Sequence, residues 1–209
     1  MKFEPGSFYF GVVDFFSIML PGGLLAYFLY GPLGPKVFGP VMPVIPDGST
    51  GAGWVIFLFA AYLFGHIVFL IGSYLDNLYD PVRKIIWPKK TDYAYRQAEV
   101  LKKKLLGPEK TDAINTFQWA KAVLTLSHPQ GMVEVARLEA DSKFFRSLLV
   151  VLAILFITVI WQGVSDMVPA VLGVLLVLSY MRYTERRYKS TEQAYRYMIV
   201  LASQKKLGK

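Results

Sequence analysis

WVIFLFAAYLFGHIVFLIGSYL, residues 54–75, decides the fold class of this chain of 209 residues. The stretch contains no Lys, Arg, Asp or Glu, and it matches the roughly 20 apolar residues with which an α-helix crosses a bilayer core. A helix fits such an environment because it pairs its own backbone N–H and C=O groups where no water is available. Residues 54–75 therefore predict a transmembrane helix.

Three further apolar stretches have the same character. They lie at about residues 8–30, 144–162 and 167–182, and the last is slightly short for a full crossing. The whole chain is 54% hydrophobic and 18% charged, which is less charge than a soluble domain of this length carries. The sequence therefore predicts an all-α integral membrane protein with four transmembrane helices. The absence of cysteine excludes a disulfide framework and a thiolate metal site.

The basic residues are distributed unevenly along the chain, and this sets the predicted topology. Residues 81–146 contain thirteen Lys and Arg against seven Asp and Glu, and residues 182–209 contain eight against two. Lys and Arg close to membrane segments are retained on the cytosolic side. We therefore expect a multi-pass protein with both termini and both basic segments in the cytosol.

These observations predict four consecutive parts. They are a first transmembrane pair (1–80), a basic helical cytosolic segment (81–143), a second transmembrane pair (144–184) and a cytosolic basic C-terminal helix (185–209).

Apolar residues at helical spacing predict further helices within the cytosolic parts. They lie at 91–106, at 111–127 and at 132–141, and together they would form a small helical cap. The last of them is either a separate short helix or continuous with the third span. Because the last basic segment lacks Gly and Pro until Gly208, one long helix is expected from about 169 to 204.

Polar residues in the first span are candidates for chemistry. A carboxylate such as Asp14 is expensive in a membrane unless it is paired or hydrated. The first and third spans run in the same direction, so Asp14 and Arg146 are expected at similar depth and an ion pair is one interpretation. A role in a pore or gate, shared with Ser17, is the other.

Two more features of the membrane segments suggest a pore or gate. Pro21, Gly22 and Gly23 interrupt the first span, and the kink expected there serves either helix packing or a gating hinge. His66 lies near the middle of the second span, where it either acts in the pathway or bonds a neighbouring helix.

The densest basic clusters lie in the two cytosolic segments. Clusters of this kind meet anionic lipid headgroups or bind a phosphate-rich ligand such as a nucleotide or oligonucleotide. The candidate residues for binding an anionic ligand are Lys102, Lys103, Lys104, Arg186, Arg187 and Lys189.

The residues do not favour an enzyme. Gly72, Asp76 and Asp80 match the second half of the metal-binding signature of CDP-alcohol phosphotransferases, but the residues at 58–63 lack its first half. The two carboxylates are otherwise expected to pair with Arg83 and Lys84. Because no set of nucleophile, base and oxyanion donor is visible, we expect neither catalysis nor a metal or cofactor.

Three stretches together carry a family resemblance. They are DFFSIMLPGG at 14–23, FGHIVFLIGS at 64–73 and EVARLEADSKFFRSL at 134–148, followed by a basic, Tyr-rich helix. With these features the chain resembles the small membrane effectors of Hailong-type anti-phage defence systems in bacteria. The resemblance implies an inner-membrane homo-oligomer, a tetramer, that opens an ion pathway during infection. It also implies control by a nucleic-acid product of a partner nucleotidyltransferase.

Two functions therefore follow from the sequence. The first is an oligomeric membrane channel or membrane-disrupting effector in anti-phage defence, gated by an anionic, nucleic-acid-like ligand at its basic cytosolic face. The alternative is a non-conducting membrane anchor or assembly partner for a soluble enzyme, with the helical cap as the docking surface.

Overall fold

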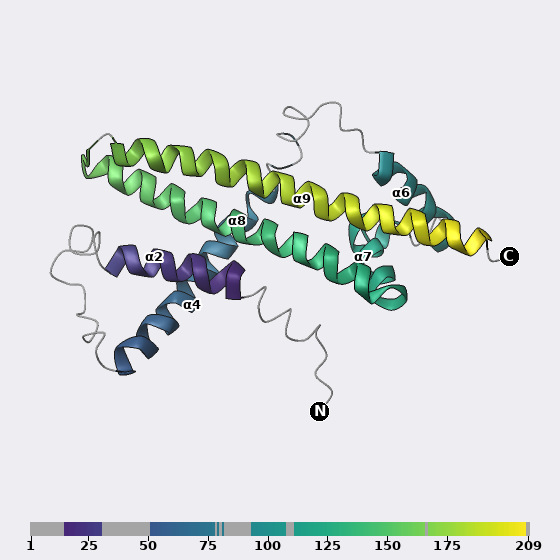
Figure 1. Ribbon diagram of the computed structural model, residues 1–209, viewed down its shortest axis with the longest axis horizontal. Coiled ribbons are helices and arrows are strands. Elements are labelled where there is room, and N and C mark those ends of the chain that lie inside the picture. The colour runs from purple at the N-terminus through teal and green to yellow at the C-terminus, as the bar shows by residue number, and fades with distance from the viewer. Residues whose placement is uncertain are drawn as a thin grey trace. The chain divides into compact units, whose positions relative to one another are not determined.

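The structure, a computed structural model, describes residues 15–30, 51–77, 79, 81, 93–107, 111–165 and 167–207. Every regular element in these ranges is helical, as the sequence predicts (Figure 1). The elements are the π-helix η1 (Phe15–Met19), α2 (Leu20–Tyr30), α4 (Gly51–Ser73), α6 (Tyr93–Leu106), the 3-10 helix η3 (Thr111–Ala113), α7 (Thr116–Ser127), α8 (Pro129–Trp161) and α9 (Met167–Leu207).

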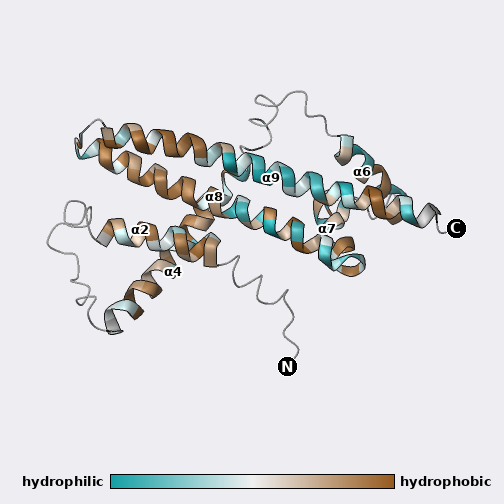
Figure 2. Cartoon of the chain, viewed as in Figure 1, coloured by the Kyte–Doolittle hydropathy of each residue, from teal (hydrophilic) through white to brown (hydrophobic). Residues whose placement is uncertain are grey.

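Three of the described helices, α4, α8 and α9, are long and apolar enough to cross a membrane. Figure 2 shows apolar residues along much of α4 and along one end of both α8 and α9. Residues 147–161 of α8 and 167–181 of α9 carry no charged side chain, and Gly163 allows the turn between them with a φ of 61°. The first predicted span is described from Phe15 onward, where it is a shorter apolar helix.

The α8 helix joins two predicted segments. The sequence predicts a helix at 132–141, either separate from the span at 144–162 or continuous with it, and the structure has a single helix from Pro129 to Trp161. Pro129 stands at the first helical position, where the missing N–H has no intrahelical partner to lose. Charged residues then continue the helix into the apolar segment, because no proline and no glycine lies between Gly131 and Trp161. The α9 helix runs unbroken to Leu207, as predicted from the lack of Gly and Pro in its second half.

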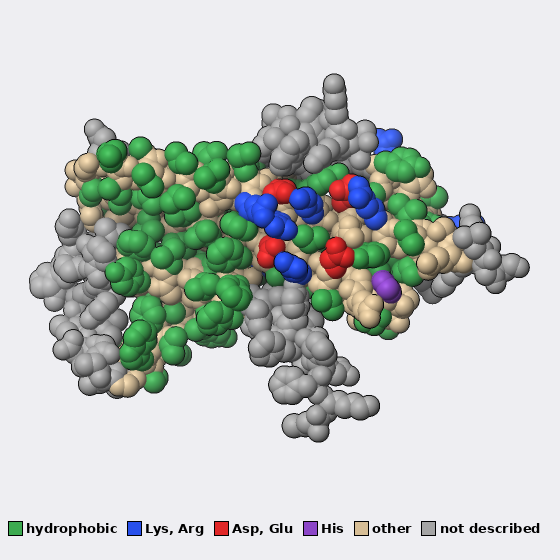
Figure 3. Space-filling model, in the orientation of Figure 1, with side chains coloured by type: hydrophobic (Ala, Val, Ile, Leu, Met, Phe, Trp, Pro, Cys, Tyr) green, Lys and Arg blue, Asp and Glu red, His purple; other side chains and the backbone are tan. Residues whose placement is uncertain are grey.

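The described helices belong to two compact units. Unit 1 comprises Met1–Asp80 and Ala140–Tyr183, and unit 2 comprises Pro81–Glu139 and Thr184–Lys209. On the face shown in Figure 3, hydrophobic side chains cover most of the described surface of unit 1. The interior of unit 1 is also apolar. Its apolar outer surface is therefore better suited to a nonaqueous environment than to water. Its buried core consists of Leu25, Val68, Val150, Val151 and Leu155.

Glycine brings α2 and α4 together in unit 1. A Cβ atom added to Gly22 would overlap the carbonyl oxygen of Ala61 and lie 2.6 Å from Cα of Gly65. A Cβ atom added to Gly65 would overlap the backbone of Ile18. The two helices therefore touch through their backbones, in the manner of small-residue contacts between membrane helices.

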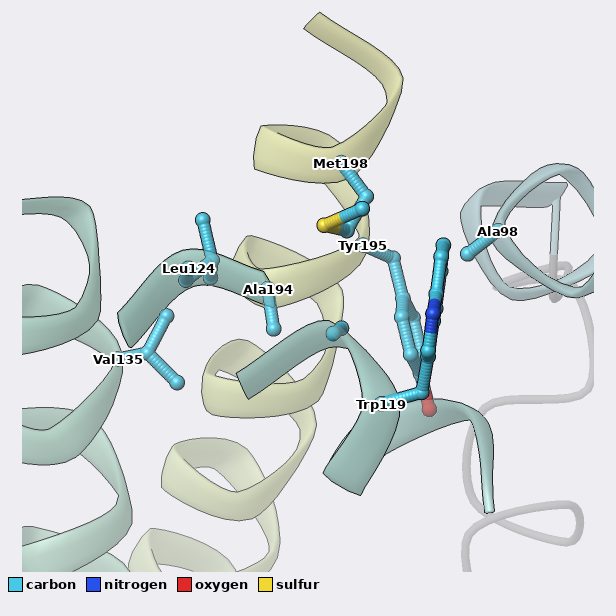
Figure 4. Close-up of a cluster of buried hydrophobic side chains, with 8 residues drawn as sticks. Ala98, Trp119, Leu124, Val135, Ala194, Tyr195 and Met198 are labelled. Carbon is cyan, nitrogen blue, oxygen red and sulfur yellow. The ribbon is translucent and has the colours of Figure 1, made fainter. Parts of the chain in front are cut away.

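Unit 2 has its own hydrophobic core, to which α6, α7, α8 and α9 all contribute (Figure 4). Trp119 of α7 and Tyr195 of α9 are its largest side chains, and Ala98 of α6 is fully buried beside them. The predicted helix at 111–127 is divided into η3 and α7, because Asn115 caps α7 by accepting a hydrogen bond from Gln118 N at 2.8 Å.

Candidate functional site

The strongest polar cluster of unit 1 centres on the carboxylate of Asp76, just after the end of α4. Arg146 of α8 donates from its Nη1 atom to Oδ2 of Asp76 at 2.6 Å. Tyr183 of α9 donates from its hydroxyl to Oδ1 of the same carboxylate at 2.7 Å. One side chain thus connects three segments that are far apart in the sequence.

Arg146 is held in place by more than its charge. Its side chain is 6% exposed, and its guanidinium lies 4.6 Å from the centre of the Phe69 ring on α4. Its stem passes over Gly72, where an added Cβ atom would lie 3.3 Å from Cγ of Arg146. The cation therefore has an aromatic face and a glycine beside it, which keep it between α4 and α8.

Tyrosine rings surround the third member of the cluster. Tyr183 is completely buried, and the centres of the Tyr79 and Tyr180 rings lie 6.1 and 6.2 Å from its own. The Tyr79 ring meets that of Tyr183 edge to face, at an interplanar angle of 68°, and the Tyr180 ring is tilted at 53°. The hydroxyl of Tyr183 is thereby directed at Asp76 by packing as well as by its hydrogen bond.

The electrostatics of this cluster make each partner depend on the others. A buried ion pair is stable when both charges are present and hydrogen-bonded, and removal of one partner leaves an uncompensated charge that costs about 3–5 kcal/mol. The carboxylate accepts from two donors, while Nε of Arg146 finds no hydrogen-bond partner among the described residues. Loss of Asp76 would therefore leave the guanidinium without its carboxylate.

The sequence predicts further partners for Arg146 and Asp76. Asp14, the predicted partner of Arg146, and Asp80 both lie outside the described residues, as do Arg83 and Lys84. In the described part of the chain, Asp76 is the carboxylate that pairs with Arg146.

The candidate residues of the first span that the structure describes lie in or beside helix contacts. Ser17 is 2% exposed and its Oγ lies 3.4 Å from the carbonyl oxygen of Ala140, while Pro21 and Gly22 are buried. The π-helix η1 ends at Met19, two residues before Pro21. A proline ring collides with the carbonyl four residues earlier in a regular helix, and a wider turn relieves this collision. Gly23 has ordinary space around it, 3.7 Å from an added Cβ atom to Cβ of Ala61.

His66 has a different environment from these residues. It lies on the exposed side of α4, and its ring contacts that of Tyr62 one turn earlier, with 4.4 Å between the centres. In the described ranges, no group of three or more His, Cys, Asp or Glu side chains is placed to hold a metal ion. His66 is therefore a polar side chain on the outer surface of an apolar helix.

The three lysines of the basic cluster on α6 have different environments. Lys102 is 5% exposed and its Nζ atom donates to the carbonyl oxygen of Ile114 at 2.7 Å, so its expected role in ligand binding is corrected to a structural one. The stem of Lys102 covers apolar neighbours while its ammonium bonds the chain just before α7. Lys103 and Lys104 are exposed. A hydrogen bond to Glu99 raises the pKa of Lys103 above its ordinary value.

The basic residues of α9 lie on a more polar part of that helix. Lys189 is half-exposed and pairs with Glu185 one turn away, with 2.6 Å between Nζ and Oε1. Arg186 and Arg187 are partly buried, and each has partners within the protein. Exposed pairs within one helix contribute little to stability, so they leave Lys189 available to another anion.

The Asp76 cluster was missed by sequence reasoning, although two signals for it were present. Gly72 and Asp76 are four residues apart, which is about one helical turn. A small residue therefore lies on the same side of the chain as the carboxylate. Arg146 is the last charged residue before the apolar segment of α8, and Tyr183 lies at the corresponding end of α9. Only the fold brings these ends together. A comparison of the chain with protein-family models, curated proteins and solved structures finds no match.

Proposed function

We propose that this chain is an oligomeric membrane channel or membrane-disrupting effector of bacterial anti-phage defence. In this proposal the first span joins α4, α8 and α9 in crossing the inner membrane, with both termini in the cytosol. The family resemblance suggests four copies. The outward position of His66 on α4 is the observation that carries the proposal.

An imidazole in the hydrocarbon core needs a hydrogen-bonding partner or water. His66 lies about two thirds of the way along α4, and the exposed side chains around it on that helix include Phe59, Leu63 and Leu70. Lipid tails would leave its ring nitrogens unbonded. A second copy of the chain or a hydrated path between copies would satisfy them, and both require an oligomer.

The interior of unit 1 supports a path between copies over a path through one chain. Ser17 and Gly22 are buried in helix contacts, and Val68 and Val151 fill the core. Side chains thus occupy the space between the described helices. The α4 surface with Tyr62 and His66 is the part of unit 1 that we assign to the pathway.

Control by an anionic, nucleic-acid-like ligand is part of the same proposal. Unit 2 would bind this product of a soluble nucleotidyltransferase through exposed and partly exposed cations, and Lys102 is now excluded from that set. Neutralising the set should lower the affinity for a short single-stranded DNA oligomer and the salt dependence of binding, whereas Lys102→Met should change neither. The set consists of Lys103, Lys104, Arg186, Arg187 and Lys189.

Single-channel recording in planar bilayers tests the channel. The purified protein should give discrete conductance steps, and His66→Phe should change their amplitude. Ile71→Phe is the matched control, because Ile71 is 43% exposed on the same helix but lies roughly 140° around the axis from His66. Equal effects of the two variants would contradict the assignment of His66 to the pathway.

The alternative, a non-conducting anchor or assembly partner, is favoured by one feature of unit 2. Leu126 at the end of α7 is 88% exposed, and Leu105 on α6 is 67% exposed, although unit 2 has a closed core of its own. Exposed apolar side chains of this size suit a docking protein. Silence in bilayers, together with co-purification of a soluble enzyme at fixed stoichiometry, would favour this function.

A further inference from the structure

We propose that Asp76, Arg146 and Tyr183 form a latch that holds the end of α4 against α8 and α9 in the non-conducting state. The inference rests on the proposed channel function and deepens it by naming the contact that must open. It concerns unit 1 alone.

The two charges of the latch are unequally buried, which indicates the partner that moves. The side chain of Arg146 is 6% exposed, whereas that of Asp76 is 28% exposed. Arg146 is also fixed by the Phe69 ring and by the surface of Gly72. Asp76 can therefore leave the cluster toward water, while the guanidinium stays between the helices.

The chain around Asp76 is suited to such a movement. The helix α4 ends at Ser73, and a turn at Tyr74 and Leu75 precedes Asp76. The backbone bonds here span three residues, from Tyr74 N to Ile71 O at 3.2 Å and from Leu75 N to Gly72 O at 3.0 Å. Bonds of this type have poorer geometry than those of an α-helix. The backbone hydrogen bonds of the turn therefore break more readily than those of the helix.

Release of Asp76 would change the environment of Arg146. A cation without its carboxylate strongly favours contact with water. Water can reach the guanidinium only if α4 and α8 separate at this end. The latch thus couples loss of one ion pair to opening of a helix contact, which is the kind of two-state element that gating requires.

Ser147 provides a direct reporter of this opening. It is completely buried next to Arg146, and its Oγ has no hydrogen-bond partner among the described residues. Replacement by cysteine therefore keeps the shape of the side chain and removes no described hydrogen bond. Because the natural chain has no cysteine, Ser147→Cys is the one site that a maleimide can label.

The experiment measures labelling of Ser147→Cys by a water-soluble maleimide in the full chain in liposomes. Asp76→Asn should increase the labelling rate on the order of tenfold or more, because the buried cation loses its partner. Asp76→Asn combined with Arg146→Met should bring the rate back toward that of the parent protein, since it leaves no buried charge.

Two control positions separate the latch from general unfolding. Gln130→Cys is exposed and should label rapidly in every background. Ala98→Cys lies in the core of unit 2 and should stay unlabelled in every background. Equal labelling of Ser147→Cys with and without Asp76→Asn would overturn the latch, and so would labelling of both Ser147→Cys and Ala98→Cys.

Ion flux in the same liposomes tests the proposed function separately. If Asp76→Asn raises both the labelling of Ser147→Cys and the flux, the latch and the channel are both supported. If labelling rises while every variant remains without ion flux, α4 is released as inferred. The channel function is then contradicted, and with it the gating role of the latch. If flux rises while labelling does not, a channel exists and the latch is wrong.

Discussion

The contact of Gly22 with α4 predicts opposite effects for two neighbouring glycines. Gly22→Ala places a methyl group 2.6 Å from Cα of Gly65, about 0.8 Å closer than the 3.4 Å at which ordinary contact begins. Gly23→Ala places the same group 3.7 Å from Cβ of Ala61, which is ordinary contact. Both substitutions gain about 1 kcal/mol of helix propensity, so their difference isolates the collision.

The magnitude of that difference follows from the cost of overpacking. Neither the Ala61 carbonyl nor the Gly65 backbone can rotate away, so the helices must separate and lose contact along their length. Extra methyl groups in filled interiors cost about 1–3 kcal/mol, which corresponds to roughly 2–12 °C in melting temperature for a chain of this size.

Thermal unfolding in detergent, followed by circular dichroism, measures this difference. The melting temperature of Gly22→Ala should lie below that of Gly23→Ala by several degrees. Equal melting temperatures would refute the backbone contact between α2 and α4.

Three further predictions concern single side chains. Tyr183→Phe should destabilise the protein by about 1–2 kcal/mol, less than Asp76→Asn, because it removes one hydrogen bond and leaves the ion pair; chemical denaturation of both variants checks the order. Lys102→Met should lower the melting temperature by removing a buried hydrogen bond, whereas Lys104→Met should leave it unchanged within error. Asn115→Ala should cost about 1 kcal/mol by removing the cap of α7, with faster hydrogen exchange in the first turn of that helix as the direct signal.

Hydrophobic periodicity predicts much of this fold because the relevant forces are local. The apolar stretch at 54–75 contains the helix α4 almost entirely, and the stretch without Gly or Pro after Arg182 becomes the second half of α9. Whether a segment forms a helix depends largely on residues that are close to one another in the chain, so the sequence alone predicts it. The continuity of α8 was harder to predict, because charged and apolar segments can share one helix.

The partners of charged side chains depend on the fold, and the sequence predicts them less well. Asp76 pairs with Arg146, which lies seventy positions away in the sequence. Lys102 belongs to a run of three lysines that looks uniform, but the helical turn directs it inward while its neighbours face solvent. In both cases the packed helices decide which charge is buried.

The glycine contact between α2 and α4 also restricts how the sequence can evolve. A collision in a protein interior is usually relieved by a smaller residue at the facing position. Here the facing atoms belong to the backbone of Ala61 and to Gly65, which has no side chain to shorten. A substitution at Gly22 therefore has no compensating change across the contact, and reversion is the direct route back to the original packing.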